Sequence, residues 1–303
     1  TDNRMKNDIQ KIIMNIPGSE SVMYPVTVES DILLHPEKWL PKECHHKKLV
    51  IIADDTVTEL YAKKLASALS AFQPLLFSFP HGESSKNYQT KYMLEEKIIS
   101  AHCNRDTVIL ALGGGVTGDL AGFIASTYMR GIPYIQLPTT LLSMIDSSVG
   151  GKTGINTPLG KNLIGAFWQP IAVVVELQCV LTLPDEQVIN GLIEAIKIFL
   201  THDADYFKFT DNHIEKILQR DLPVIKKIVE RAIQLKIDIV SVDEKEIGPR
   251  MILNFGHTIG HALEKISDYT LLHGYAVALG ILVEAKISEL CGLLSSENVQ
   301  IIY

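Results

Sequence analysis

The fold is decided by residues 107–119, which read TVILALGGGVTGD. Residues 108–112 are all apolar, which is typical of a strand buried on both faces of a parallel sheet. Gly113, Gly114 and Gly115 follow directly and lead into a helical pattern. Such a turn leaves backbone N–H groups free to bind a phosphate at a helix N-terminus. We interpret it as a pyrophosphate-binding turn. A plain strand-to-helix turn is the alternative, although one glycine would suffice for it.

Apolar strand patterns recur on both sides of this stretch, at residues 49–55, 74–80, 132–138 and 171–177. Helical patterns separate the early strands, at 56–72 and 85–102. This alternation predicts a Rossmann-like α/β domain with a parallel sheet over residues 1–182, which binds ligands at the carboxyl ends of its strands. After Thr182 the pattern is helical to the end, so we expect residues 183–303 to form a helical domain.

Residues 137–167, LPTTLLSMIDSSVGGKTGINTPLGKNLIGAF, combine polar and glycine-rich positions with regularly interleaved apolar ones. This composition indicates a long ordered loop, and such loops are usually functional. Lysines beside glycine-freed N–H groups suit an anionic substrate. The alternative is a mobile surface loop with incidental lysines. The polar residues of interest are Asp146, Lys152, Lys161 and Asn162.

Residues 249–274 read PRMILNFGHTIGHALEKISDYTLLHG. We expect one buried helix that begins at Pro249, because the segment is apolar nearly all round. The spacing of four, three and four residues would place Arg250, Asn254, His257 and His261 on one stripe of that helix. Hydrogen-bonded core residues are the alternative interpretation of these histidines.

Residues 191–200, GLIEAIKIFL, contain Glu194 and Lys197 in apolar surroundings, which predicts a buried and partnered pair of charges. Lys236 is similar. Glu194, His257 and His273 together suggest a catalytic zinc site, since one carboxylate, two imidazoles and an open position are its usual pattern. The spacing alone does not prove such a site.

The composition excludes several classes of protein. The 303-residue chain has a net charge of −7, so a general nucleic-acid binder is not expected. No uncharged apolar run reaches the length of a membrane span, and the N-terminus lacks an apolar signal core. The four cysteines form no CxxC motif, which favours a reduced, cytoplasmic protein. We expect Cys44-His45-His46 to lie in a solvated loop.

These segments together resemble the 3-dehydroquinate synthase family of sugar-phosphate cyclases, from about Leu49 to Leu293. The resemblance is carried by GGGVTGDLAGF, RGIPYIQLPTTLLSMIDSSVGGKTGIN, PLGKNLIGAF, GLIEAIK, and NFGHTIGHALE with LLHG. It implies an N-terminal NAD-binding α/β domain followed by a C-terminal helical metal-binding domain.

The resemblance also implies site residues. Zn2+ (or Co2+) would be bound by Glu194, His257 and His273, and His261 would contact the substrate. Arg130 would reach the site of a neighbouring subunit, so a homodimer is expected. The remaining substrate contacts would come from Asp146, Lys152, Asn162, Lys197, Lys236, Arg250 and Asn254. The NAD+ contacts would come from Asp54, Glu83, Lys86, Gly114, Gly115, Asp119, Thr139, Thr140, Lys161 and Thr182.

The reaction implied by the resemblance converts 3-deoxy-D-arabino-heptulosonate 7-phosphate to 3-dehydroquinate and phosphate, in the shikimate pathway. NAD+ oxidises the C5 alcohol, phosphate is eliminated, NADH reduces C5 again, and an intramolecular aldol reaction closes the ring. The cofactor is thereby recycled in each turnover.

The chain departs from the family at two points. Tyr275 stands where the family usually has glutamate, which affects the surroundings of the metal ligands. Family members usually continue beyond the position of Tyr303, so we expect a missing segment or an incomplete site. The rival functions are another sugar-phosphate cyclase of the 2-deoxy-scyllo-inosose synthase type, a metal-dependent polyol dehydrogenase, and an inactive binding protein.

Overall fold

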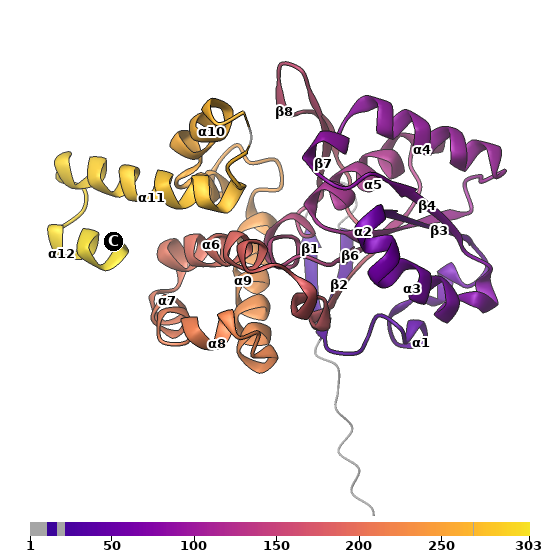
Figure 1. The fold of residues 1–303 in the computed structure, drawn as a ribbon, viewed down its shortest axis with the longest axis horizontal. Coiled ribbons are helices and arrows are strands. Elements are labelled where there is room, and N and C mark those ends of the chain that lie inside the picture. Colours follow the sequence, from indigo (N-terminus) through magenta and orange to yellow (C-terminus); the bar gives the residue numbers. More distant parts are fainter. Residues whose placement is uncertain (1–10, 17–21, 269) are drawn as a thin grey trace, which may run out of the picture. The chain divides into compact units, whose positions relative to one another are not determined.

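The computed structural model describes residues 11–16, 22–268 and 270–303, and Figure 1 shows their helices and strands. The chain divides into two compact units. The first unit comprises residues 1–139 and 147–181, and the second comprises residues 140–146 and 182–303. The first is an α/β unit and the second consists of helices, so the predicted fold class is confirmed.

The first unit contains a seven-stranded sheet with the strand order β1-β2-β9-β6-β5-β3-β4. Only the pairing of β1 with β2 is antiparallel, and the other neighbours run parallel. The sequence patterns predicted five of these strands and missed β1 and β2. The bounds are β1 (Lys11–Ile16), β2 (Val22–Glu29), β3 (Lys48–Asp54), β4 (Leu75–Phe79), β5 (Thr107–Gly113), β6 (Tyr134–Pro138) and β9 (Ala172–Glu176).

The sheet is buried on both faces. Along β3, Leu49 and Ile51 belong to one core cluster, whereas Val50 and Ile52 belong to another. The first cluster includes Leu65 of α3, and the second includes residues of α4 and α5. An uninterrupted apolar strand is therefore what this packing requires. The helices of this unit are α1 (Pro36–Trp39), α2 (Asp55–Val57), α3 (Lys63–Ala68), α4 (Tyr88–Ser100) and α5 (Gly115–Thr127).

Two local predictions for the first unit need correction. Residues 137–167 are not a loop throughout, because β7 (Lys152–Thr157) and β8 (Gly160–Phe167) form a hairpin (Figure 1). The two backbones approach so closely that a Cβ at Gly165 would lie 1.9 Å from the Thr153 carbonyl oxygen. Cys44 is also not solvated: it ends a short 3-10 helix and its side chain is fully buried.

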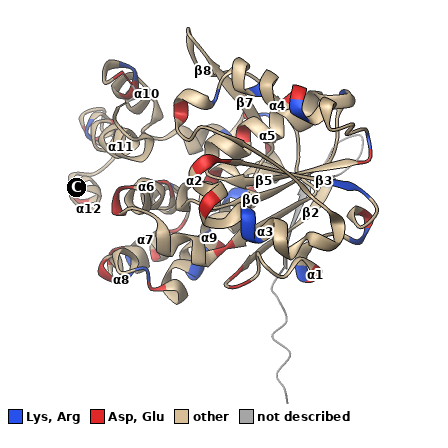
Figure 2. Ribbon diagram, turned by 45° about the vertical axis from the view of Figure 1, so that its right-hand side comes forward, with Lys and Arg blue, Asp and Glu red and all other residues tan. Residues whose placement is uncertain are grey.

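The second unit is built from seven α-helices within the part of the chain that the structure describes (Figure 1). No helix among the described residues has the length and apolar character needed to cross a membrane. Figure 2 colours acidic and basic residues on the ribbon, and both kinds occur on elements such as α4 and α8. The bounds are α6 (Asp185–His202), α7 (Ala204–Asp211), α8 (Ile214–Leu218), α9 (Leu222–Val242), α10 (His257–Ile266), α11 (His273–Leu290) and α12 (Ser296–Ile302).

The single buried helix expected from Pro249 onward is wrong. Residues 249–254 form a 3-10 helix, and α10 begins only at His257. Phe255 leaves the helical conformation with ψ 127°, and Gly256 adopts the left-handed region with φ 79°. Half of the residues of α10 are exposed, and within it only Gly260 and Glu264 are buried. Arg250 and Asn254 therefore do not share a helical stripe with the histidines.

Glycines set the spacing of the helices in the second unit. A Cβ at Gly280 of α11 would lie 1.9 Å from the Gly256 carbonyl oxygen, just before α10. A Cβ at Gly274 would lie 2.2 Å from the carbonyl oxygen of Asn190 in α6. Because the obstructing atoms belong to the backbone, no side-chain rotation can relieve these contacts.

We expect the substitution Gly280→Ala to lower the free energy of unfolding by about 1–3 kcal/mol, since overpacking forces backbone shifts of this cost. Denaturant unfolding followed by circular dichroism would measure it. Leu279→Ala, at the neighbouring half-exposed position of α11, is the control. A stability for Gly280→Ala equal to that of the wild type would contradict the close packing of α10 on α11.

Candidate functional site

Three potential metal ligands come together in the second unit. Glu194 lies within α6, while His257 and His273 are the first residues of α10 and α11. The Glu194 Oε1 atom lies 3.4 Å from His273 Nε2 and 3.9 Å from His257 Nε2. The three candidate ligand atoms all lie within 4.8 Å of one another.

The arrangement fits a tetrahedral divalent ion. Glu194 is 2% exposed, and no donor among the described residues makes a hydrogen bond to its Oε1 atom. An unpaired buried carboxylate oxygen is costly, so a ligand for it is expected. Zinc–ligand bonds of about 2.0–2.1 Å place neighbouring ligands of a tetrahedron about 3.4 Å apart. The separation of Glu194 from His273 agrees with this value.

Lys197 fixes the charge of Glu194, because its ammonium group donates to the Oε2 atom. Burial alone would raise the pKa of Glu194, but the charge of Lys197 and the neighbouring His273 together outweigh burial and lower the pKa to about 2. Burial, reinforced by Lys197, lowers the pKa of His257 to about 4. Burial also disfavours protonation of His273, but the carboxylates of Glu194 and Glu264 raise its pKa to about 9.

A second ion pair, of buried Lys236 with partly exposed Asp146, lies close to this triad. The ammonium of Lys236, on α9, donates to Asp146 Oδ1 at 2.6 Å and also to the Asp146 carbonyl oxygen. Burial opposes ionisation of Asp146, but the charges of Lys236 and Lys197 lower its pKa well below the usual range. Burial also lowers the pKa of Lys236. Arg250 is 2% exposed, and its guanidinium donates to the Glu244 carbonyl oxygen.

The three histidine rings form one group. The ring centroid of His257 lies 5.3 Å from that of His261 and 5.2 Å from that of His273. The ring centroids of His261 and His273 are 5.8 Å apart. His261 is the exposed member, with 60% of its side chain accessible. Glu264, which the sequence patterns did not single out, lies 2.7 Å from His261 Nδ1 through its Oε2 atom.

In the first unit, the glycine turn lies where β5 ends and α5 begins. Gly114 is the residue before α5 and offers no side-chain cap to the helix N-terminus. A Cβ at Gly113 would lie 2.3 Å from the hydroxyl oxygen of Thr117, which is buried and makes no hydrogen bond with the described residues. An uncapped helix start with bare backbone suits an anionic group such as a pyrophosphate. The residues present therefore fit a dinucleotide.

Lys86 joins several of the other predicted residues. Its side chain is 6% exposed, and its ammonium group lies 2.5 Å from Asp119 Oδ2 and 2.6 Å from Asn162 Oδ1. Asn162 has a φ of 56°, a left-handed conformation that these contacts hold in place. Asn156, a residue not predicted, accepts the Asn162 backbone N–H and donates to Glu83 Oε1 at 2.7 Å. The 83–86 turn and the β7–β8 hairpin are thus fastened together.

The remaining predicted residues lie at several places in the two units, and Thr139 adjoins the glycine turn, because its N–H donates to the Gly113 carbonyl oxygen. Asn254 is exposed and lines a pocket of about 560 Å3 together with Phe255, Thr258 and Glu284. Arg130 is exposed with a φ of 68°. Asp54 caps α2 through the Val57 N–H, and burial raises the pKa of this aspartate. The other residues predicted to contact substrate or NAD+ are Lys152 and Lys161 on the hairpin, Thr139 and Thr140 after β6, and Thr182 before α6.

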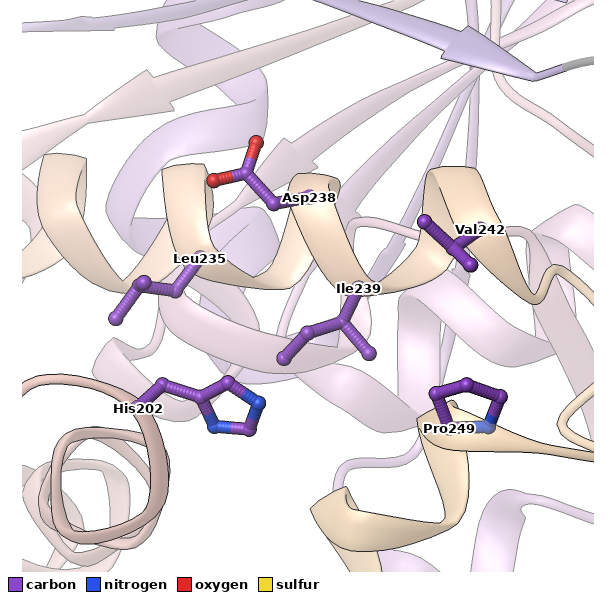
Figure 3. A pocket seen from close by; sticks show the side chains of 6 residues that line it. All are labelled: His202, Leu235, Asp238, Ile239, Val242 and Pro249. Atoms are coloured by element: carbon purple, nitrogen blue, oxygen red, sulfur yellow. The ribbon is translucent and has the colours of Figure 1, made fainter.

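A pocket of about 340 Å3 in the second unit contains none of the predicted site residues. Figure 3 shows its lining side chains, which come from α6, α9 and the start of the 249–254 segment. They are His202, Leu235, Asp238, Ile239, Val242 and Pro249.

Comparison with known proteins decides the family. Residues 76–190 match the family described as 3-dehydroquinate synthase N-terminal, and residues 191–303 match 3-dehydroquinate synthase C-terminal. The 3-dehydroquinate synthase of Nitrosospira multiformis is 44% identical over 279 residues, which cover 91% of this chain and 76% of that protein. The chain belongs to the 3-dehydroquinate synthase family.

A second curated relative and two solved structures are also similar to this chain. The 3-dehydroquinate synthase of Thermodesulfovibrio yellowstonii is 45% identical over 83% of this chain and 71% of that protein. A solved 2-deoxy-scyllo-inosose synthase, complexed with carbaglucose-6-phosphate, NAD+ and Co2+, has a TM-score of 0.90 and 28% identity, covering 97% of this chain and 79% of that one. The 2-epi-5-epi-valiolone synthase ValA from Streptomyces hygroscopicus, with NAD+ and Zn2+ bound, has a TM-score of 0.85 and 27% identity, covering 95% and 80%.

We expect His257→Ala to weaken Co2+ binding by more than the roughly 10–100-fold that is typical when only a supporting partner of a ligand is lost. Titration of the metal-free protein with Co2+, followed by visible absorption, would measure this. His202→Ala, which changes an exposed histidine of α6 outside the triad, should bind Co2+ like the wild type. Unchanged binding by His257→Ala would contradict the assigned ligand set.

Proposed function

We propose that this member of the family converts 3-deoxy-D-arabino-heptulosonate 7-phosphate to 3-dehydroquinate and phosphate, as a phosphate-eliminating lyase of the shikimate pathway. The observation that carries the proposal is the Glu194, His257 and His273 set beside the buried Lys197. The identity of 40–46% to enzymes named 3-dehydroquinate synthase supports the choice of substrate over that of other sugar-phosphate cyclases.

The cofactors we propose are NAD+ and Zn2+ or Co2+, which when bound supply hydride transfer and polarisation of the substrate oxygen that is oxidised. Glu194, His257 and His273 would hold the metal ion. The turn of Gly114 and Gly115 would hold the pyrophosphate of NAD+. The remaining nucleotide contacts would come from Asp54, Glu83, Lys86, Asp119, Thr139, Thr140, Lys161 and Thr182.

The second unit would bind and orient the polar groups of the substrate. Lys197 and Lys236 are buried cations whose partners, Glu194 and Asp146, keep them fixed in position. Such preorganised groups stabilise developing negative charge without reorganising during the reaction. His261 would contact a substrate hydroxyl through Nε2, because its Nδ1 atom faces Glu264. Arg250 and Asn254 would bind the substrate carboxylate and hydroxyls.

Lys152, Asn162 and Arg130 would contact the substrate as well. Lysine and arginine bind phosphate through charge-assisted hydrogen bonds. The Asn162 side chain is already fixed by Lys86, which supports a positioning role on the substrate. The product phosphate leaves as an anion, so cations that bind it favour its elimination.

We also propose a homodimer, in which Arg130 reaches the site of the partner, and a cytoplasmic location. The exposure of Arg130 supports the first, and the four free thiols support the second. A sedimentation mass near that of one 33.6 kDa chain would contradict the dimer. Recovery of the protein outside the cytoplasm on cell fractionation would contradict the location.

The activity assay measures phosphate release from the heptulosonate phosphate with catalytic NAD+ and added Zn2+, together with absorbance at 340 nm. We expect phosphate release without net NADH, and its loss on addition of a chelator. Net NADH from simple polyols without phosphate release would instead support a polyol dehydrogenase. Phosphate release from a sugar phosphate without a carboxylate, in place of the heptulosonate, would support a cyclase of the 2-deoxy-scyllo-inosose synthase type.

We expect Lys86→Met to raise the Kd for NAD+ at least about tenfold, which corresponds to about 1.4 kcal/mol. The methionine keeps the length of the side chain but removes the Lys86 ammonium group from the Asp119 carboxylate. Isothermal titration with NAD+ would measure the effect. Lys64→Met changes an exposed lysine of α3 in the same unit and should bind like the wild type. Equal affinities in the two variants would exclude Lys86 from the nucleotide site.

A further inference from the structure

Glu264 is a buried carboxylate on a helix of which half the residues are exposed. It is 1% exposed, whereas Lys265 and Ile266 beside it in the last turn of α10 are exposed. Its Oε2 atom lies 2.7 Å from His261 Nδ1 and 3.5 Å from His273 Nδ1. Burial of a carboxylate is costly unless its oxygens are paired. The buried carboxylate of Glu264 therefore lies where two imidazole rings can pair with it.

The contact fixes how each ring is turned. A carboxylate only accepts hydrogen bonds, so the Nδ1 atom that faces Glu264 carries a proton, and Nε2 is the nitrogen left to bind a metal ion or a substrate group. In His273 that Nε2 atom is the one that lies 3.4 Å from Glu194 Oε1. His273 therefore lies between two carboxylates, with Glu264 on one ring nitrogen and the proposed metal position at the other.

The same three groups, His261, Glu264 and His273, could in principle hold an ion themselves. One distance opposes this. The 2.7 Å separation of Glu264 from His261 is that of a hydrogen bond. It is shorter than the roughly 3.4 Å between neighbouring ligands of a tetrahedral zinc ion with bonds of about 2.1 Å.

We propose that Glu264 is a positioning residue that orients His273 toward the metal ion and His261 toward the substrate. One buried carboxylate would then couple the metal site to the substrate-binding histidine. This inference rests on the proposed function. It also bears on Tyr275: although this position lacks the usual glutamate, His273 keeps a carboxylate partner in Glu264.

The test compares Glu264→Ala, Glu264→Gln and His261→Ala in Co2+ titrations followed by visible absorption, without substrate. We expect Glu264→Ala to weaken Co2+ affinity by about 10–100-fold, as is typical when the partner of a ligating histidine is removed. Glu264→Gln keeps an acceptor oxygen of the same reach, so its loss should be smaller. His261→Ala should leave the affinity unchanged, because His261 is not a ligand. Lys265→Ala, at the exposed neighbouring position, is the control.

The second readout is kcat/KM at saturating Co2+, measured for Glu264→Ala, His261→Ala and the double variant. If Glu264 acts on the substrate through His261, the double variant should be no slower than His261→Ala. Thermal unfolding identifies any variant that has lost its fold. If Glu264→Ala has lost its fold, the isosteric variant Glu264→Gln is used in its place to test the role of Glu264.

Three outcomes would overturn the proposal. Wild-type Co2+ affinity in Glu264→Ala and Glu264→Gln would remove Glu264 from the support of His273. Loss of Co2+ binding in His261→Ala would assign the ion to the His261, Glu264 and His273 set instead. Failure of the wild type to bind Co2+ would remove the proposed metal site as well, which separates that failure from a failure of the positioning role alone.

Discussion

The ion pair between Glu194 and Lys197 is the interaction on which the second unit depends. Both side chains are almost fully buried on α6, and each would be costly without the other. Lys197 occupies one carboxylate oxygen and leaves the second toward His257 and His273. Because these histidines start α10 and α11, one buried charge determines where three helices must meet. The cost of burying it is acceptable if a cation completes its surroundings.

The first unit also contains a buried lysine that is paired with a carboxylate, here Lys86 with Asp119. Lys86 is held by Asp119 from α5 and by Asn162 from the hairpin, so three segments distant in sequence meet at one ammonium group. Asn156 adds hydrogen bonds to the same connection. In both units a buried lysine therefore serves two purposes. It neutralises a carboxylate, and it fixes the positions of residues that we assign to ligand binding.

Some of this could be predicted from the sequence. The strands β3 and β5 were recognisable because a strand buried on both faces must be apolar throughout. By contrast, β2 contains Pro25, which argues against a strand, and its pairing with β9 begins only at Val26. The chemistry of the metal triad could be inferred from residue types. Its geometry could not, since it arises from the packing of α6, α10 and α11 rather than from any local pattern.

The errors have physical reasons as well. Residues 249–263 look like one helix because their apolar side chains recur with helical spacing, but Gly256 adopts a left-handed conformation that ends this continuity. Glu264 was missed because a glutamate followed by a lysine on a helix normally faces solvent. Asn156 was missed because it lies in the hairpin, where the sequence suggested only a loop.

The close contact of Gly280 with the Gly256 carbonyl has an evolutionary consequence. Any side chain at Gly280 would push α11 away from α10 and carry His273 with it, so drift at this position is linked to the metal site although it contacts no ligand. Neutral variation in these helices is instead expected on their outer faces, at exposed positions such as Leu279 and Lys286. A lineage that changed its metal or lost its chemistry would be free to replace this glycine, and its replacement would mark that loss of function.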